Sequence, residues 1–361
     1  MPKEFGSIPK SIKIKMKSMK VLVTGGCGFI GSHTCEYYVK KGDEVISFDN
    51  MTKHELMRTG YGTDTARDYN WNFLKKLGVN LIKGDIRDYE KLKEAAKGCD
   101  FIIHTAAQPA MTISVEDPDL DFSTNVLGTF NVLKVARDYK IPIVSCATIH
   151  VYGNKINEEL KEGEDRYLRE PPEIDEKYPT MGGTLTPLHV SKRAAELYVQ
   201  TFIDTYGLEA ASFRLTGLYG PYQFGGEDHG WVANFAIRAV LGKPINIYGT
   251  GKQVRDILYA KDAVEAFDAF HQKRKPGIYN IGGGMKTSIS LIECIELLKE
   301  ITGKEVRVNF YPERLGDLRY FVCDATKAQR ELDWQAKTLP KEGITNLVNW
   351  IKENINLFKV K

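Results

Sequence analysis

Several features that mark whole classes of protein are missing from this 361-residue sequence. No apolar run approaches the roughly 20 residues that a membrane-spanning helix needs, so no such helix is expected. The six cysteines form no Cys-x-x-Cys pair and the seven histidines no His-Glu-x-x-His motif, so we expect neither a metal site nor zinc hydrolysis. Repeats and low-complexity segments are also absent. These absences leave an ordinary globular protein.

Charge and cysteine content indicate which partners and which cellular compartment to expect. Lysine plus arginine number 50 against 47 aspartate plus glutamate, without a basic stripe interleaved with aromatics, so no nucleic-acid partner is expected. Residues 1–18 are rich in lysine but lack the continuous apolar stretch of a secretory leader, and we expect a flexible basic tail there. The cysteine spacing favours reduced thiols and a cytoplasmic protein. With 42% hydrophobic residues, the chain can bury one large domain or two closely joined ones.

The most specific pattern of the chain lies in residues 20–50. An apolar run is followed by Gly25, Gly28 and Gly31, then by a helical pattern and a second apolar run that ends at Asp49. This order predicts a strand, a tight turn, a helix whose N-terminus binds phosphate groups, and a second strand whose terminal carboxylate accepts hydrogen bonds from ribose hydroxyls. The same carboxylate would repel a 2′-phosphate. We therefore predict NAD, in preference to NADP, as the cofactor.

Short apolar runs continue to alternate with helical patterns along the chain. These runs begin at Asn80, Phe101, Ile143 and Ala210. Such alternation predicts a parallel sheet with helices on both faces, which is the Rossmann-type doubly wound α/β fold. Because ligands of these sheets lie at the carboxyl ends of the strands, the residues at those ends are expected to line the site. They are Asp85, Ala106, Ala107 and Thr148.

The remaining segments suggest an insertion and a second domain. Residues 153–187 are polar, rich in Glu, Pro and Gly, and too long for a simple connection, which indicates a lid or an insertion near the site. Beyond residue 221, glycines and short strands between helices predict a smaller α/β cap domain. The expected boundaries are a nucleotide-binding domain at 19–220, to which 253–280 return, and a cap formed by 221–252 and 281–361.

The chain resembles the extended short-chain dehydrogenases/reductases, in particular their nucleotide-sugar epimerase and dehydratase group. The resemblance covers nearly all of the chain from about residue 20. It rests on the glycine turn that ends at Gly31, Asp49-Asn50, Gly84-Asp85-Ile86-Arg87-Asp88, His104-Thr-Ala-Ala-Gln108, Thr124-Asn-Val-Leu-Gly-Thr129, Val151-Tyr-Gly153, Lys192 and Arg255-Asp256. Within this group, residues 223–232, 251–256 and 316–319 resemble segments of the CDP-paratose and CDP-tyvelose 2-epimerases.

Ligands and an assembly follow from the resemblance. It implies NAD, a nucleotide-diphosphate sugar with a CDP-sugar favoured, and a homodimer formed through helices at about 122–139 and 187–206. The implied cofactor contacts are Gly25, Gly28, Phe29, Ile30, Gly31, Asp49, Asn50, Asp85, Ile86, Ala106, Ala107, Gln108, Asn125 and Lys192. The implied substrate contacts are Gln223, Trp231, Val232, Arg255 and Arg319. The two arginines suit a diphosphate because their planar, permanently charged groups bind it through paired hydrogen bonds.

The family's catalytic tyrosine is missing. In the family, a tyrosine four residues before the lysine takes the proton of a sugar hydroxyl, and here Leu188 occupies that position. Thr148 and Lys192 keep their expected places, which the resemblance assigns to the sugar oxygen and the nicotinamide ribose. His150 follows Thr148 by two residues, where related dehydratases carry an acid/base, and an imidazole that titrates near neutral pH can take and return a proton.

We therefore predict Thr148, His150 and Lys192 as catalytic residues, with His189, Tyr152 and Tyr178 as alternatives to His150. The predicted function is NAD-dependent epimerisation of a nucleotide-diphosphate sugar, similar to that of the CDP-sugar 2-epimerases. Other reactions stay open, namely 4-epimerisation, dehydration and C–H deprotonation by His150. A protein that lost its catalytic tyrosine and only binds NAD and a nucleotide sugar is also open.

Overall fold

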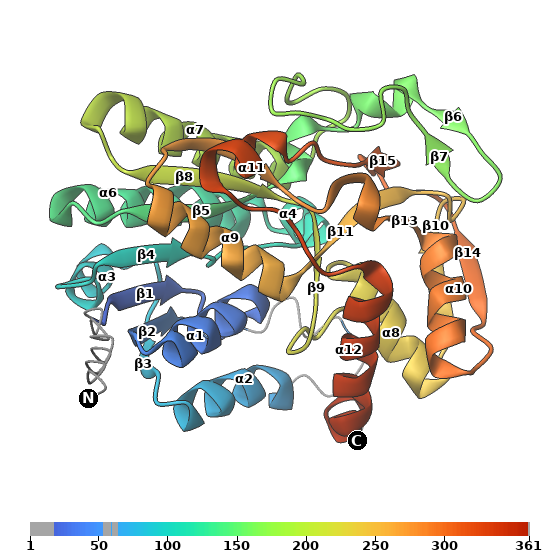
Figure 1. The fold of residues 1–361 in the computed structure, drawn as a ribbon, viewed down its shortest axis with the longest axis horizontal. Helices are drawn as coiled ribbons and strands as arrows, with labels where there is room; N and C mark the ends of the chain where they lie inside the picture. Colours follow the sequence, from blue (N-terminus) through green and yellow to red (C-terminus); the bar gives the residue numbers. More distant parts are fainter. Residues whose placement is uncertain (1–17, 53–58, 60–63, 360–361) are drawn as a thin grey trace, which may run out of the picture.

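A seven-stranded parallel sheet forms the centre of the protein (Figure 1). The computed structural model describes residues 18–52, 59 and 64–359, so nearly all of the expected basic tail at 1–18 lies outside the described residues. In the order β3-β2-β1-β4-β5-β8-β12, the strands are Asn80–Lys83, Glu44–Asp49, Lys20–Thr24, Phe101–His104, Ile143–Thr148, Ala210–Leu215 and Gly277–Ile281. All neighbouring pairs are parallel. The predicted Rossmann-type doubly wound fold is confirmed.

Helices cover both faces of this sheet because its strands are apolar on both faces. On β1, Val21 and Val23 belong to a core shared with α1 (Phe29–Lys41) and α9 (Ala260–Lys273), together with α2 (Asp64–Lys76) and α11 (Thr326–Leu332). Leu22 lies between them and belongs to the opposite core, shared with α3 (Tyr89–Ala95), α6 (Thr129–Tyr139) and α7 (Pro187–Tyr206). Successive side chains of a strand point to opposite faces, so a continuous apolar run is what two covered faces require.

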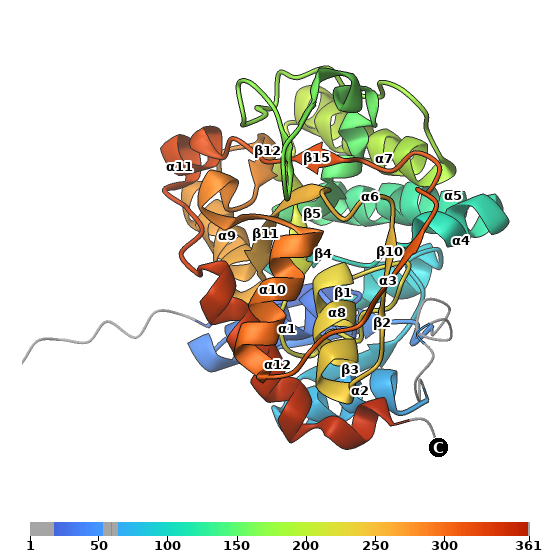
Figure 2. The ribbon, with the colours of Figure 1, turned by 90° about the vertical axis from the view of Figure 1, so that its right-hand side faces the viewer.

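A second core beside the sheet forms the cap. Helices α8 (Trp231–Leu241), α10 (Leu291–Thr302) and α12 (Pro340–Glu353) lie side by side around it (Figure 2). The short strands of the cap are β9 (Gly217–Tyr219), β10 (Ile245–Tyr248), β11 (Val254–Tyr259), β13 (Ser288–Ser290), β14 (Val308–Tyr311) and β15 (Tyr320–Phe321). Strand β11 pairs with β9, β13 and β15, and β10 pairs with β14.

Three elements differ from the expected domain boundaries. Strand β9, expected in the nucleotide-binding domain, pairs with β11 and places Tyr219 in the cap core. Strand β11, expected in the nucleotide-binding domain, pairs with cap strands instead of joining the main sheet. Its Ile257 is buried in the cap core and its neighbour Leu258 in the main core, so this strand joins the two cores. Helix α11, expected in the cap, lies against α9 and β12 of the main domain, where Ala328 and Leu332 are buried.

The polar segment 153–187 folds against the cap. It contains the short hairpin of β6 (Lys161–Glu162) and β7 (Tyr167–Leu168), and its Ile156, Tyr167 and Ile174 are buried. The Arg166 guanidinium pairs with the carboxylate of Glu293, on α10. Buried apolar side chains and a partly buried ion pair make this segment a packed insertion.

Asp256, on β11, is a fully buried carboxyl group whose pKa is raised by burial to about 7. The Gly284 N–H donates to its Oδ2, while its Oδ1 has no partner among the described residues. An unfolded aspartate titrates at about 3.9. The folded chain therefore binds this proton more tightly, so the stabilisation is fully present below about pH 4 and is lost as the pH rises through about 7.

We expect Asp256→Asn to remove this dependence, because the amide has no charged form. The melting temperature of the variant relative to the parent is expected to be higher at pH 8 than at pH 5. Differential scanning calorimetry at both pH values measures the two differences. Equal differences at pH 5 and pH 8 would contradict the raised pKa of Asp256.

Candidate active site

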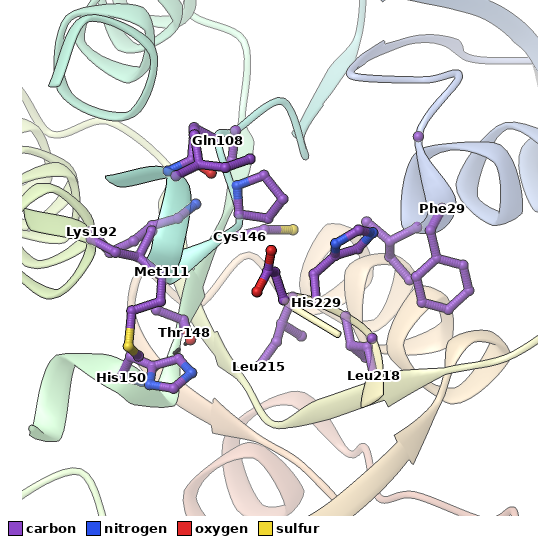
Figure 3. A pocket seen from close by; sticks show the side chains of 18 of the residues that line it. Phe29, Gln108, Met111, Cys146, Thr148, His150, Lys192, Leu215, Leu218 and His229 are labelled. Carbon is purple, nitrogen blue, oxygen red and sulfur yellow. Dashed lines mark hydrogen bonds between the residues drawn. The ribbon is translucent and has the colours of Figure 1, made fainter. Parts of the chain in front are cut away.

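A cavity of about 890 Å³ lies at the carboxyl edge of the main sheet and extends into the cap. Its lining includes residues at the ends of β2, β5 and β8 and in the turns that follow β1 and β4, as well as residues of α8 and β10. The volume is near the upper end of the roughly 300–1,000 Å³ that is usual for ligand sites. Figure 3 shows Lys192, Thr148 and His150 on one side of this cavity and Phe29 on the other. The site is where doubly wound sheets bind ligands.

The turn after β1 has the close contacts of a dinucleotide cradle. Gly25 has a φ of +70°, and a Cβ there would lie 2.7 Å from the backbone of Ala106. A Cβ on Gly31 would lie 2.1 Å from the carbonyl oxygen of Gly25, so only glycine allows α1 to pass this close to the turn. Gly28 precedes the first turn of α1 and provides no side-chain cap. The N–H groups of that turn are therefore left for a phosphate group, and the residues fit a dinucleotide.

Asp49 ends β2 beside this turn and lines the cavity. One carboxylate oxygen accepts the Cys27 N–H at 2.9 Å and the other accepts the Met51 N–H at 2.7 Å. Each oxygen keeps a lone pair for a ribose hydroxyl. All residues predicted to bind the cofactor line the cavity except Asp85 and Asn125.

Asp85 and Asn125 do not line the cavity themselves but contact residues that do. Asp85 accepts hydrogen bonds from Arg87 and from the Asn50 side chain, and the Arg87 interaction holds its pKa low, at about 2. Asn125 is buried, and its side chain accepts the Gln108 N–H and donates to the Gln108 carbonyl. Asp121, which the sequence did not single out, accepts from both Asn125 and Gln108. The pair Asn125 and Asp121 therefore positions the loop after β4.

Leu188 and Lys192 line the cavity from α7, and Thr148 lines it from the end of β5. Leu188 and Lys192 are four residues apart, which places both on one face of the helix. The Leu188 side chain is aliphatic and buried, so it can neither take nor give a proton. Burial lowers the pKa of the Lys192 ammonium, while the nearby Cys146 and Asp121 act in the opposite direction.

His150 lies in a 3-10 turn, Ile149–Tyr152, directly after β5, and its backbone N–H donates to the Thr148 hydroxyl at 3.3 Å. Its Nδ1 is buried without a partner among the described residues. The prediction that this imidazole titrates near neutral pH is not supported. Burial, followed by the charges of His189 and Arg255, lowers the pKa of His150 to about 3, so the imidazole is neutral at pH 7.

The alternatives to His150 do not line the cavity. The Tyr152 hydroxyl is buried, donates to Asn280 and accepts from Arg214, and the Tyr178 hydroxyl donates to Glu159. His189 packs edge-on against His150 at 5.5 Å between ring centres, but its Nδ1 accepts the Thr186 N–H at the start of α7. Its ring thus completes the helix N-terminus, which leaves His150 as the imidazole of this group that lines the cavity.

Among the predicted substrate contacts, Gln223, Trp231 and Arg255 line the cavity, whereas Val232 and Arg319 do not. Val232 is 1% exposed and packs in the cap core, because it faces the interior side of α8. The Arg319 guanidinium makes two hydrogen bonds to Glu313, outside the cavity. Arg314 lines the cavity in its place. The glycine turn at residues 316–319, on which Arg319 was predicted, could also have indicated Arg314, because this arginine lies two residues before Gly316.

The comparisons with known proteins agree with this geometry. The NAD dependent epimerase/dehydratase family matches residues 21–282. The chain belongs to this family. It is 35% identical to the CDP-paratose 2-epimerase of Salmonella typhi over 347 residues, which cover 92% of this chain and 99% of that protein.

Solved structures of family members have the same fold. The UDP-glucose 4-epimerase of Thermus thermophilus, in complex with NAD, superposes with a TM-score of 0.75 at 32% identity and covers 92% of this chain and 99% of its own. The UDP-glucuronic acid 4-epimerase of Bacillus cereus, in complex with UDP-glucuronic acid and NAD, has a TM-score of 0.78 at 25% identity, with 93% and 100% covered. These relatives act at different carbons, so the family alone does not specify the reaction.

Membership of the epimerase/dehydratase family confirms three predictions, namely the family itself, an enzyme of the epimerase or dehydratase type, and NAD as its cofactor. Within the described ranges, no group of three or more His, Cys, Asp or Glu side chains is placed to hold a metal ion. No helix among the described residues has both the length and the apolar character needed to cross a bilayer.

We expect Asp49→Ala to weaken NAD binding by about ten- to a hundredfold, since hydrogen bonds to a charged group contribute about 1.5–3 kcal/mol. NADP binding is expected to weaken less, because the change also removes the charge that opposes a 2′-phosphate. Isothermal titration of cofactor-stripped protein measures both affinities. Asp138→Ala is the control, because this carboxylate pairs with Arg137 away from the cavity. An unchanged NAD affinity would show that Asp49 does not hold the ribose.

Proposed function

We propose that the protein is an NAD-dependent epimerase of a nucleotide-diphosphate sugar, with a CDP-sugar as substrate and a 2-epimerisation as the reaction. The observation that carries the proposal is that Thr148, Lys192 and His150 line the same cavity as the dinucleotide cradle, and that the Nδ1 of His150 is buried without a partner among the described residues. The 35% identity to a CDP-paratose 2-epimerase supports the choice of nucleotide and carbon. The six free cysteines of the chain support a reducing compartment such as the cytoplasm.

NAD bound in the cradle would supply a nicotinamide ring that accepts a hydride from a sugar carbon and returns it to either face. Gly25, Gly28 and Gly31 would leave room for its pyrophosphate, and Asp49 would accept hydrogen bonds from its adenosine ribose. We assign the nicotinamide ribose to Lys192, which lies on the side of the cavity that also holds Thr148 (Figure 3). The chain would thereby orient the reacting carbon toward the nicotinamide.

We assign to His150 the removal of the proton from the reacting sugar hydroxyl. Thr148 donates a hydrogen bond to the same sugar oxygen. A neutral imidazole has one unprotonated nitrogen, so it can take this proton at pH 7. The positive charge of Arg255 is one cause of the low pKa of His150. A substrate diphosphate that pairs with Arg255 would offset that charge and raise the pKa of His150, so the substrate itself makes the imidazole a better base.

The diphosphate is assigned to Arg255 and Arg314, which both line the cavity. Arg255 is 13% exposed and lies 3.6 Å from an Asp317 oxygen, longer than a close ion pair, so a phosphate oxygen can compete for it. Gln223 and Trp231 line the same part of the cap. The Gln223 Oε1 is buried and has no partner among the described residues, as expected of an atom that a ligand hydroxyl satisfies.

Leu188 favours a second function, the binding of NAD and a nucleotide sugar without turnover. An aliphatic residue at this position removes the family's phenol, and His150 without a substrate is a weak base. Under this alternative the cradle and the cap would still bind their ligands. The two functions differ only in turnover, which makes them easy to separate.

We expect the protein to epimerise at least one sugar when it is incubated with NAD and a panel of CDP-, UDP-, GDP- and dTDP-sugars in deuterated water. Internal return of the hydride leaves the reacting carbon without deuterium, whereas deprotonation of carbon introduces it. Proton NMR identifies the carbon and distinguishes epimerisation at C2 from 4-epimerisation and dehydration. Should no sugar react, the binding function is the better one, and Leu188→Tyr is the variant that would restore turnover.

We expect His150→Ala to lower kcat by about two to four orders of magnitude, the usual effect of losing a positioned proton-transfer group. NAD affinity is expected to stay unchanged. In the parent, the pH profile of kcat/KM reports the ionisations of the free enzyme, so it is expected to show no ionisation of His150 between pH 5 and pH 9. The profile of kcat reports the enzyme–substrate complex, so its acid limb is expected at a higher pH than that of kcat/KM. A variant as fast as the parent would rule out His150 as the base.

We propose a homodimer through the helices predicted to form it. Large apolar side chains that are 37% to 60% exposed gather on the elements α5 (Pro118–Phe122), Ser123–Gly128, α6 and α7. They are Phe122, Leu127, Tyr139, Val190, Leu197, Tyr198 and Tyr206. A surface with this many exposed large apolar groups is typical of a protein interface.

Leu197→Glu is expected to halve the mass found by light scattering at micromolar concentration, because a charge would be buried in the interface. Leu168→Glu is the matched control, since both leucines are 48% exposed and Leu168 lies on β7, in the insertion. A parent protein that is monomeric at every concentration tested would refute the dimer.

A further inference from the structure

Glu227 is a carboxylate in the cap part of the cavity that the proposed reaction does not use. It lies in the segment between β9 and α8 and lines the cavity, with 26% of its side chain exposed. Three groups from other elements hold it in place. Arg238 and Asn246 donate to its Oε1 at 2.8 and 2.6 Å, and the Tyr248 hydroxyl donates to its Oε2 at 2.8 Å.

These contacts leave the carboxylate with capacity for a ligand. A carboxylate has about four acceptor positions, two on each oxygen. Among the described residues, Oε1 of Glu227 has two donors and Oε2 has one, so one position on Oε2 is open. Because its orientation is already fixed, a donor that reaches Oε2 does not have to order the side chain first.

Arg314 connects this carboxylate to the diphosphate site. Its guanidinium lies 3.9 Å from the centre of the Tyr248 ring and donates to the backbone carbonyl of Glu227 at 2.7 Å. Tyr248 in turn stacks on Tyr311, with 5.4 Å between ring centres. If a diphosphate binds Arg314, as proposed above, the base of the same nucleotide comes within reach of Tyr248 and Glu227.

We propose that Glu227 selects a nucleotide whose base carries an exocyclic amino group, and cytosine in particular. The inference rests on the proposed function, because it requires that a nucleotide-diphosphate sugar binds in this cavity. The amino group of cytosine can donate to the open position on Oε2. Uracil and thymine present a carbonyl oxygen at the corresponding position, which the carboxylate repels. A single open position fits one amino hydrogen better than the paired donors of guanine.

A structural role for Glu227 makes a different prediction. The ion pair with Arg238 also ties the segment 223–230 to α8, so its loss would lower stability or affinity for every nucleotide alike. Selection by the carboxylate changes the ratio of two affinities. A neutral glutamine keeps the size of the side chain and an oxygen for Arg238, and its amide can donate to a carbonyl oxygen.

The test is isothermal titration of the NAD-loaded parent, Glu227→Gln and the control Glu313→Gln with CDP, UDP and GDP. Glu313 is a suitable control because it also pairs with an arginine, Arg319, is 30% exposed and lies outside the cavity. We expect the parent and the control to bind CDP about ten- to a hundredfold more tightly than UDP, the usual range for a hydrogen bond to a charged group. Glu227→Gln is expected to lose most of that ratio, chiefly through tighter binding of UDP.

The outcomes separate this proposal from the function on which it rests. Equal affinities of the parent for CDP and UDP would overturn selection by Glu227 and leave the nucleotide-sugar site standing. Tighter binding of GDP than of CDP would overturn the choice of cytosine. If no nucleoside diphosphate binds the parent, both the selection and the proposed function fail. The parent is measured independently of the variant, so equal affinities for CDP and UDP overturn the proposal even where the variant fails to fold.

Discussion

A buried ion pair between Arg214, on β8, and Glu196, on α7, holds the two halves of the catalytic region together. The side chains are 3% and 0% exposed, and the guanidinium donates to both carboxylate oxygens at 2.8 Å. Arg214 also donates to the Tyr152 hydroxyl in the turn after β5. Helix α7, the sheet and the turn of His150 are therefore joined by one network. Removing one partner of a buried pair costs about 3–5 kcal/mol, since it leaves an uncompensated charge.

The electrostatics of this region differ from those that the resemblance implies. Leu188 stands in place of a phenol, and burial favours the neutral form of both the His150 imidazole and the Lys192 ammonium, which line the cavity with Thr148. Under the proposed function, the protein offers a neutral proton acceptor, His150, whose basicity depends on what binds at Arg255. Under that function, binding of the substrate diphosphate at Arg255 also raises the pKa of His150, so proton transfer follows substrate binding.

The main sheet and the cap line different parts of the cavity and differ in how they contribute to it. The main sheet contributes a glycine turn, a strand-end carboxylate and a helix N-terminus, which depend on backbone geometry and leave little freedom for substitution. The cap contributes side chains on loops and short strands, among them Glu227 and Arg314. Family members with the same fold act on UDP-glucose and on UDP-glucuronic acid. Such variety is expected where a fixed fold carries exchangeable side chains in its substrate site.

The amino-acid sequence by itself determined the fold class and the cofactor, because glycine spacing, apolar runs and the acid at Asp49 act between residues that are close in sequence. It also directed attention to Leu188 and His150. Only the tertiary structure decided that Arg314 and not Arg319 reaches the cavity, that Val232 belongs to the cap core, and that β11 pairs outside the main sheet. The low pKa of His150 is also a consequence of the tertiary structure, because it results from burial and from the charge of Arg255, on a strand distant in sequence. Burial and charge pairing depend on residues far apart in the chain, which no local pattern of the sequence records.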